Sequence, residues 1–240
     1  SGMLLQRMDY SGKFFPDMQP LNVFVVALIA MLVCAAFGTV TGFFIAYLNV
    51  PPFIATLAMM EIVYGIGLIV TNATPLGGYV EQYTNVSNGK FLGINYLIWI
   101  AIIVAAITWF IFNMTRHGKY MYAIGGNPQA AEVAGVPVKA TLILIYMKAA
   151  AMYGLAGFML GAKAGGASVQ TGYGYEMEAI AACTIGGVSV TGGRGKVSSA
   201  IIGVAVFELL KVALQYLGMN ANAQYIACLL YTSDAADDLI

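Results

Sequence analysis

One long stretch without charge constrains the fold of this sequence most. Between Asp17 and Glu61 there is no Asp, Glu, Lys or Arg, whereas one helix needs only about 20 apolar residues to cross the membrane hydrocarbon. The stretch is long enough for two crossings, and Pro51-Pro52 divides it, because proline interrupts a helix. We therefore predict membrane-spanning helices at 23–48 and 53–70, joined by a tight turn.

The composition of the whole chain agrees with a membrane protein. Of its 240 residues, 60% are hydrophobic and 9% are charged, against roughly 25% charged residues in a soluble domain. Other apolar stretches predict spans at 96–114, 140–162 and 197–217, and the start of another at 223–231. The fold class is therefore predicted to be an all-α, polytopic transmembrane helix bundle in the lipid bilayer. The eleven basic and eleven acidic residues cancel, so nucleic-acid binding is not expected.

Basic residues indicate which loop faces the cytoplasm. Arg116, Lys119 and Lys139 lie between the third and fourth predicted spans, whereas the 71–95 loop carries one lysine. Cytoplasmic loops of membrane proteins have an excess of Lys and Arg. The 115–139 loop is therefore predicted to be cytoplasmic, and the 71–95 loop to be external, with room for a short amphipathic helix.

The 165–195 segment is rich in glycine but contains an apolar helical piece, YEMEAIAACTI. Irregular backbone occurs at membrane depth only where protein or a water-filled cavity covers it, so we predict a broken or re-entrant helix. Gly187 and Gly192 have the spacing of a nucleotide-binding phosphate loop, but Gly193 stands at the lysine position and no strand pattern precedes it. We reject nucleotide binding and interpret these glycines as positions for close helix packing and a sharp turn.

Four ionisable side chains lie inside predicted spans, where a charge is costly and is a functional candidate by default. Glu208 and Lys211 are three residues apart and can pair on one helix face. Lys148 either extends to the cytoplasmic interface or has a functional role. Glu61 either faces a cavity, pairs with Lys148 or packs within the bundle.

Two more carboxylates, Glu176 and Glu178, open the helical piece at 175–185. Acidic residues are favoured at the start of a helix, and this explanation competes with a role in a substrate path or gate at the external face. The candidates for a translocation path or gate are thus Glu61, Lys148, Glu176, Glu178, Gly186, Gly187, Gly192 and Gly193.

No residue set typical of catalysis or metal binding appears in the sequence. His117 has no acidic or cysteine residue near it in sequence, and Cys34, Cys183 and Cys228 lie far apart, without the spacing of a zinc site. We expect no catalytic residues, no metal site and no cofactor bound by this chain.

The cytoplasmic loop contains a pattern for one short helix. Gly125-Gly126 predicts a turn, Asn127 is a favourable N-cap, and Pro128 suits the first helical position. QAAEVA then gives one or two helical turns, and Gly135 is predicted to end them, with Pro137 just beyond. So short a helix is unstable alone. We expect it to dock into a partner, and the alternative is a helix that lies on lipid.

This loop, YAIGGNPQAAEVAGV, resembles the cytoplasmic coupling loop of the ABC-importer permeases for monosaccharides, the ribose, xylose and galactose group. Three other stretches resemble that family in the same order: IAYLNVPPFIATLAMMEIVYGI, YEMEAIAACTIGGVSVTGGRGKV and NANAQYI. The resemblance covers residues 4–226. It is nearest to the galactose and methyl-galactoside permeases, notably through LLQRMDY and FFPDM near the start.

The resemblance implies an all-helical permease in the bacterial cytoplasmic (inner) membrane. Such a permease forms a homodimer, binds two ATPase subunits that hold ATP and magnesium, and receives a monosaccharide from a periplasmic sugar-binding protein. The coupling segment to the ATPase would comprise Gly125, Gly126, Asn127, Pro128, Ala130, Ala131 and Gly135.

The sequence also departs from the family pattern. The family's N-terminal spans are missing, Glu61 stands where an apolar residue is usual, and the last spans are replaced. We therefore expect 1–230 to be a single, incomplete permease domain. The last stretch, YTSDAADDLI, places three aspartates directly after an apolar run, so we expect 231–240 to be a non-native tail, and the alternative is a native hydrophilic terminus.

Two other functions remain open from the sequence. One is a secondary transporter driven by an ion gradient, with Glu61 and Lys148 as relay groups. The other is a membrane scaffold that transports nothing and uses its loop to recruit a cytoplasmic protein.

Overall fold

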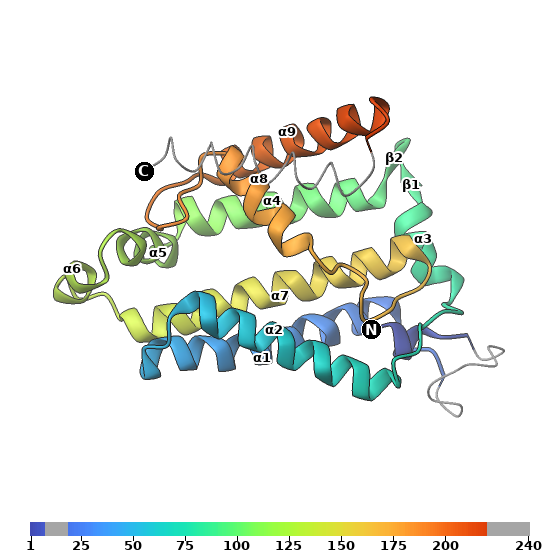
Figure 1. Ribbon diagram of the computed structural model, residues 1–240, viewed down its shortest axis with the longest axis horizontal. Coiled ribbons are helices and arrows are strands. Elements are labelled where there is room, and N and C mark those ends of the chain that lie inside the picture. The colour runs from blue at the N-terminus through green and yellow to red at the C-terminus, as the bar shows by residue number, and fades with distance from the viewer. Residues whose placement is uncertain (8–18, 220–240) are drawn as a thin grey trace. The chain divides into compact units, whose positions relative to one another are not determined.

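The computed structural model describes residues 1–7 and 19–219, and these are largely helical (Figure 1). The elements are η1 (Gly2–Leu5), α1 (Val23–Leu48), α2 (Pro52–Thr71), α3 (Glu81–Asn88), β1 (Lys90–Phe91), β2 (Ile94–Asn95), α4 (Tyr96–Met114), α5 (Arg116–Gly126), α6 (Pro128–Val133), α7 (Val138–Ala164), α8 (Tyr175–Ile185) and α9 (Val197–Tyr216). β1 and β2 form a small antiparallel pair. The predicted span at 223–231, Cys228 and the 231–240 tail lie outside the described residues.

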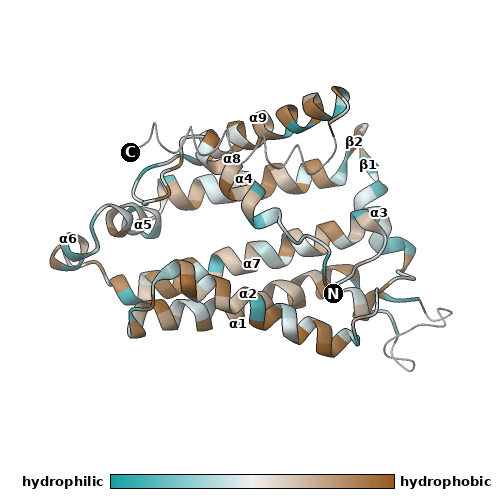
Figure 2. Cartoon of the chain, in the orientation of Figure 1, coloured by the Kyte–Doolittle hydropathy of each residue, from teal (hydrophilic) through white to brown (hydrophobic). Residues whose placement is uncertain are grey.

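Five helices, α1, α2, α4, α7 and α9, are long and apolar enough to cross a membrane. All five were predicted, with ends that differ from the observed ones by at most two residues, and Figure 2 shows their hydrophobic character along most of their length. Local chemistry sets their ends. The Asn22 side chain accepts a hydrogen bond from the Phe24 amide at the start of α1, and Asn49 ends that helix in the left-handed conformation.

The described chain divides into two compact units. Unit 1 contains residues 1–103 and 137–172, and unit 2 contains residues 104–136 and the described chain from Tyr173 onward. The assignment of 1–230 to one permease domain stays a prediction.

Unit 1 is built on the antiparallel pair of α1 and α7. Gly38 and Gly42 of α1 have the G-x-x-x-G spacing, which lets helix backbones approach closely in a membrane. A Cβ atom added at Gly38 would lie 2.5 Å from the Ala150 Cβ atom, and one added at Gly154 would lie 2.8 Å from the Ala30 carbonyl oxygen. The two helices therefore pack backbone to backbone along their length.

One end of this helix pair carries a buried cluster formed with η1 and α3. Its buried members are Leu5, Val23, Val26, Tyr79, Tyr83, Phe158 and Ala162. The Tyr83 hydroxyl donates a hydrogen bond to the Phe158 carbonyl oxygen at 2.7 Å. Burial, and then the neighbouring Tyr79, raise the pKa of Tyr83. The cluster fixes the short helix α3 that the sequence allowed in the 71–95 loop.

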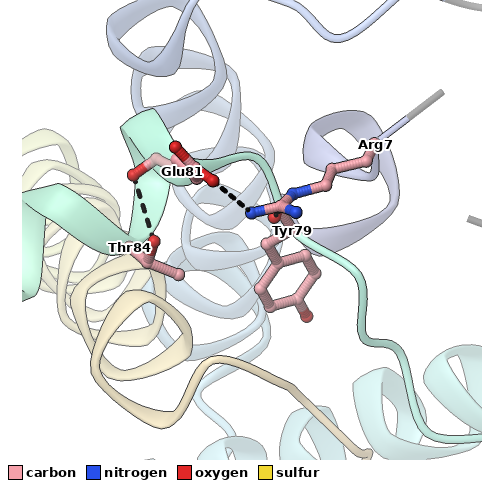
Figure 3. Close-up of polar contacts among 4 residues, drawn as sticks. All are labelled: Arg7, Tyr79, Glu81 and Thr84. Carbon is pink, nitrogen blue, oxygen red and sulfur yellow. Dashed lines mark hydrogen bonds and ion pairs between the residues drawn. The ribbon is translucent and has the colours of Figure 1, made fainter. Parts of the chain in front are cut away.

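Polar contacts join Arg7, two residues after η1, to the same loop, as Figure 3 shows. The Arg7 Nε atom donates to the Tyr79 carbonyl oxygen at 2.9 Å, and its guanidinium forms an ion pair with Glu81 at 3.1 Å. At the opposite end of the α1–α7 pair, Lys139 lies over the Tyr47 ring, 5.1 Å from its centroid. Within unit 1, the 71–95 loop and Lys139 thus lie at opposite ends of two spanning helices, as the predicted sidedness requires.

Unit 2 contains the antiparallel pair of α8 and α9. Ala181, Ala182 and Phe207 form its buried centre, and a Cβ atom at Gly203 would lie 2.6 Å from the Gly186 amide nitrogen. α8 is the predicted helical piece of the glycine-rich segment. Its 11 residues extend for about 16 Å, roughly half of a membrane crossing.

Candidate functional site

The short helix α6 begins at the residues that the sequence predicts, with Asn127 as its N-cap and Pro128 as its first residue. Asn127 has an extended backbone, and its side-chain oxygen accepts a hydrogen bond from the Ala130 amide at 3.0 Å. Pro128 occupies the first helical position, where its missing N–H group costs nothing. The predicted N-cap is confirmed.

The end of α6 is equally well defined. Gly135 has a φ of +82°, a conformation that favours glycine. Its amide donates to the Glu132 carbonyl oxygen and the Val136 amide donates to the Ala131 carbonyl oxygen, both at 3.0 Å. These two bonds form a Schellman motif, with Gly135 just past the last helical turn. The predicted stop is therefore confirmed, and α6 is closed at both ends.

The predicted turn at Gly125-Gly126 is wrong, because both glycines belong to helix α5. The sequence predicts only a basic flank at 116–122, whereas the structure has helix α5 there. A signal was available, since the Thr115 hydroxyl caps α5 by accepting from the Gly118 amide at 3.2 Å. Gly118 has no room for a side chain beside the carbonyl groups of Ile111 and Phe112, which lets α5 follow α4 directly. Asn127 alone separates α5 from α6.

The exposure of α6 distinguishes two faces. Ala131 is buried, whereas Ala130, Glu132 and Val133 are exposed. Val133 is 91% exposed. This outward face can bury apolar surface only against something outside the described chain.

The end of α5 contacts the glycine turn that follows α8. A Cβ atom at Gly193 would lie 2.7 Å from the Gly126 amide nitrogen, and one at Gly192 would lie 3.1 Å from the Gly125 carbonyl oxygen. The Tyr122 hydroxyl donates a hydrogen bond to the Gly195 carbonyl oxygen at 2.8 Å. Two motifs that are distant in the sequence, the coupling loop and GGVSVTGGRG, therefore meet in unit 2.

The other glycines of this segment have different surroundings. Gly186 packs against the backbone of Ser199 and Ala200 at the start of α9, as predicted for close helix packing. Gly187 has a φ of +74° and nothing within 4 Å of an added Cβ atom. Gly187 therefore serves the predicted sharp turn and no close contact.

An ion pair joins α8 to α9. The Lys211 Nζ atom lies 2.8 Å from a Glu178 carboxylate oxygen and 3.9 Å from Glu208, so the predicted local pair exists but is the longer of the two. The Glu178 side chain is only 13% exposed. Its other oxygen is buried and accepts no hydrogen bond from the described residues. Glu176, by contrast, is exposed.

The structure does not bring Glu61 and Lys148 together. Glu61 is exposed on α2, Lys148 is half-buried on α7, and no ion pair joins them in the part of the chain that the structure describes. This pairing was one of three alternatives for Glu61. Roles for either residue in a path or an ion relay stay predictions.

Comparison with known proteins identifies the family. A family model described as the permease component of the branched-chain amino acid transport system matches residues 1–231. The chain belongs to this permease family. Among its relatives are the galactose/methyl galactoside import permeases of Escherichia coli K12 and Haemophilus influenzae. Each is 40% identical, the first over 93% of this chain and 68% of the relative, the second over 94% and 69%.

The ribose import permease of Escherichia coli K12 is 35% identical over 85% of this chain and 65% of its own length. No solved structure gives a significant match. With five helices of spanning length and permeases of the inner membrane as its relatives, this permease is a multi-pass protein of the bacterial inner membrane.

Proposed function

We propose that this chain is the permease subunit of an ABC importer that carries a monosaccharide of the galactose or ribose type into the cytoplasm. The observation that carries the proposal is the 40% identity to import permeases for galactose and methyl galactoside, which extends over 93% of the chain. The double-capped helix α6 supports it, since a rigid, exposed helix suits a docking element.

The proposal assigns ATP hydrolysis to a partner, so this chain is not itself an enzyme. A separate ATPase holds ATP and magnesium, and α6 docks into it through its exposed face with Val133 at the centre. A periplasmic protein delivers the sugar, and two copies of the permease form the pore. Docking buries the Val133 side chain, which contributes about 1.5–3 kcal/mol for a branched apolar residue.

The residues predicted for the translocation path or gate differ in how well they suit contact with a sugar. A pore has to bind its substrate weakly enough to release it, and the hydroxyl groups of a sugar suit transient hydrogen bonds with carboxylates. Glu61 and Glu176 are exposed and can contact a passing sugar directly. Glu178 is paired with Lys211 and its other oxygen is buried, so a sugar reaches it only after a movement that uncovers this oxygen. Lys148, Gly186 and Gly187 are weaker candidates, because none has a carboxylate.

The test is reconstitution of the permease with its ATPase and binding protein in proteoliposomes. We expect uptake of radiolabelled galactose or ribose that requires ATP and continues when an ionophore collapses the proton gradient. Uptake that follows the gradient and ignores ATP would support the secondary transporter instead. ATPase binding without any sugar uptake would support a scaffold.

A variant of α6 sharpens this test. Val133→Asp places a charge at a position that is 91% exposed, so the fold should tolerate it, while a central interface contact is lost at a cost of about 2 kcal/mol or more. We expect roughly 30-fold less ATPase to co-purify. Val190→Asp, at another exposed valine of unit 2, makes the same chemical change outside α6. Equal losses in both variants would contradict docking through Val133.

A further inference from the structure

The contact between α5 and the Gly192–Gly195 turn has no side chain between its two backbones. A Cβ atom at Gly125 would overlap the Gly193 amide nitrogen, and one at Gly193 would lie 2.8 Å from the Gly126 Cα atom. Contacts of this kind leave no flexible group to absorb a displacement, since packed protein has low compressibility. A movement of the end of α5 is therefore transmitted to the turn.

The turn itself is held by its own hydrogen bonds. The Ser189 amide donates to the Arg194 carbonyl oxygen at 3.0 Å, and the Gly192 amide donates to the Ser189 carbonyl oxygen at 3.2 Å. The Tyr122 hydroxyl adds a bond from α5 to Gly195. The turn can thus move as a body rather than deform.

Beyond the turn, α8 and α9 are fixed to each other. Gly203 packs on Gly186 near the turn, and Glu178 pairs with Lys211 about 12 Å further along α8, at 1.5 Å per helical residue. These two contacts bracket most of α8. A displacement that reaches the turn consequently reaches both helices.

We propose that the Gly192–Gly195 turn is the relay between the coupling segment and the α8–α9 pair. ATP-driven movement of α6 passes through α5 and this turn to the α8–α9 pair, and so to Glu178. The inference rests on the proposed function and deepens it. Gly192 and Gly193, which the sequence predicts in the translocation path or gate, thereby have a positioning role instead.

Two pairs of variants isolate this contact. Gly193→Ala and Gly187→Ala impose the same backbone strain, with φ values of +72° and +74°, but only the first meets backbone atoms. Gly125→Ala and Gly126→Ala both add a methyl group to α5, and again only the first collides. Within each pair, the difference between the variants measures the contact and not the strain.

The measurement is galactose transported per ATP hydrolysed by the reconstituted transporter. Loss of folded protein lowers transport and hydrolysis together and leaves this ratio unchanged, so a merely structural role would not move it. We expect Gly193→Ala and Gly125→Ala to lower the ratio about 2- to 30-fold relative to their partners, the range found for residues in coupling networks, with the ATPase still bound.

Tyr122→Phe keeps the ring and removes only the bond to Gly195, and it should lower the ratio less than Gly193→Ala. This variant keeps the test decisive if an alanine variant fails to insert. Equal ratios for Gly193→Ala and Gly187→Ala, or for Tyr122→Phe and wild type, would overturn the relay. If the wild-type protein binds no ATPase, both the proposed function and the relay are overturned. This outcome is observed with the wild-type protein alone, so it is distinguishable from a failure of the relay.

Discussion

The two antiparallel helix pairs, α1–α7 in unit 1 and α8–α9 in unit 2, use glycine in the same way but differ in charge. In both pairs the two backbones approach so closely at a glycine that a Cβ atom would not fit there. No ion pair joins α1 to α7 among the described residues, because α1 has no charged residue, although α7 carries three lysines. α8 and α9, by contrast, are joined by the Glu178–Lys211 ion pair. Separating a buried ion pair leaves its charges without compensation. The α8–α9 pair is therefore held together by charge as well as by packing, and the α1–α7 pair by packing without an ion pair.

The largest effect should come from breaking the ion pair at its lysine. Lys211→Met leaves Glu178 charged at a position that is 13% exposed, and we expect a loss of about 2–3 kcal/mol in unfolding free energy, less than for a fully buried pair because Lys211 is 28% exposed. Thermal or SDS-induced unfolding in detergent measures it.

Glu178→Gln is the matched control for that experiment. It leaves Lys211 with Glu208 at 3.9 Å, so it should cost only about 1 kcal/mol, close to the value of one hydrogen bond. Equal costs for the two variants would show that charge does not distinguish α8–α9 from α1–α7.

A smaller effect is expected in the α1–α7 pair from Gly154→Ala. The new Cβ atom would lie 2.8 Å from the Ala30 carbonyl oxygen, and overpacking costs about 1–3 kcal/mol, offset by roughly 1 kcal/mol of helix propensity. Gly157→Ala, one turn away on α7 with nothing within 4 Å, should instead stabilise by up to about 1 kcal/mol. If both variants stabilise the protein, the close contact between α1 and α7 is not what holds unit 1 together.

The smallest effect concerns the cluster at the end of α1–α7. Tyr83→Phe removes the hydrogen bond to the Phe158 carbonyl oxygen and should cost about 1 kcal/mol. Because the pKa of Tyr83 is raised from 10.0 in the folded protein, its contribution is complete below pH 10 and is lost as the pH rises above that value. Unfolding of wild type and variant in detergent, compared at increasing pH, measures both effects. An unchanged alkaline response in Tyr83→Phe would assign the pH dependence to another group.

Local features of the fold were predictable from the sequence. The spanning helices follow from apolar length, and the two ends of α6 follow from Asn127, Pro128 and Gly135, because each of these acts on residues next to it in the chain. Helix α5 was missed because its basic residues also fit a cytoplasmic flank and its two terminal glycines suggested a turn.

The contacts of the candidate site were not predictable in the same way. Lys211 is three residues from Glu208 but pairs more closely with Glu178, 33 residues away. The Gly125–Gly193 contact likewise joins distant segments, and no periodicity in a single sequence reports which glycines will meet. The motifs could be found one by one, whereas their juxtaposition required the fold.

The antiparallel packing of α1 on α7 has a consequence for how the protein is made. A ribosome adds about 5–20 residues per second, so α1 waits on the order of 10 s before α7 is complete. During that delay the Gly38-x-x-x-Gly42 surface faces lipid or the insertion machinery. Both α2 and α4 are synthesised before α7, the helix that packs on this surface. After its insertion, α1 thus has to remain available for a partner that is synthesised late. Because α1 has no charged residue, its exposure to the lipid hydrocarbon during this delay costs little free energy.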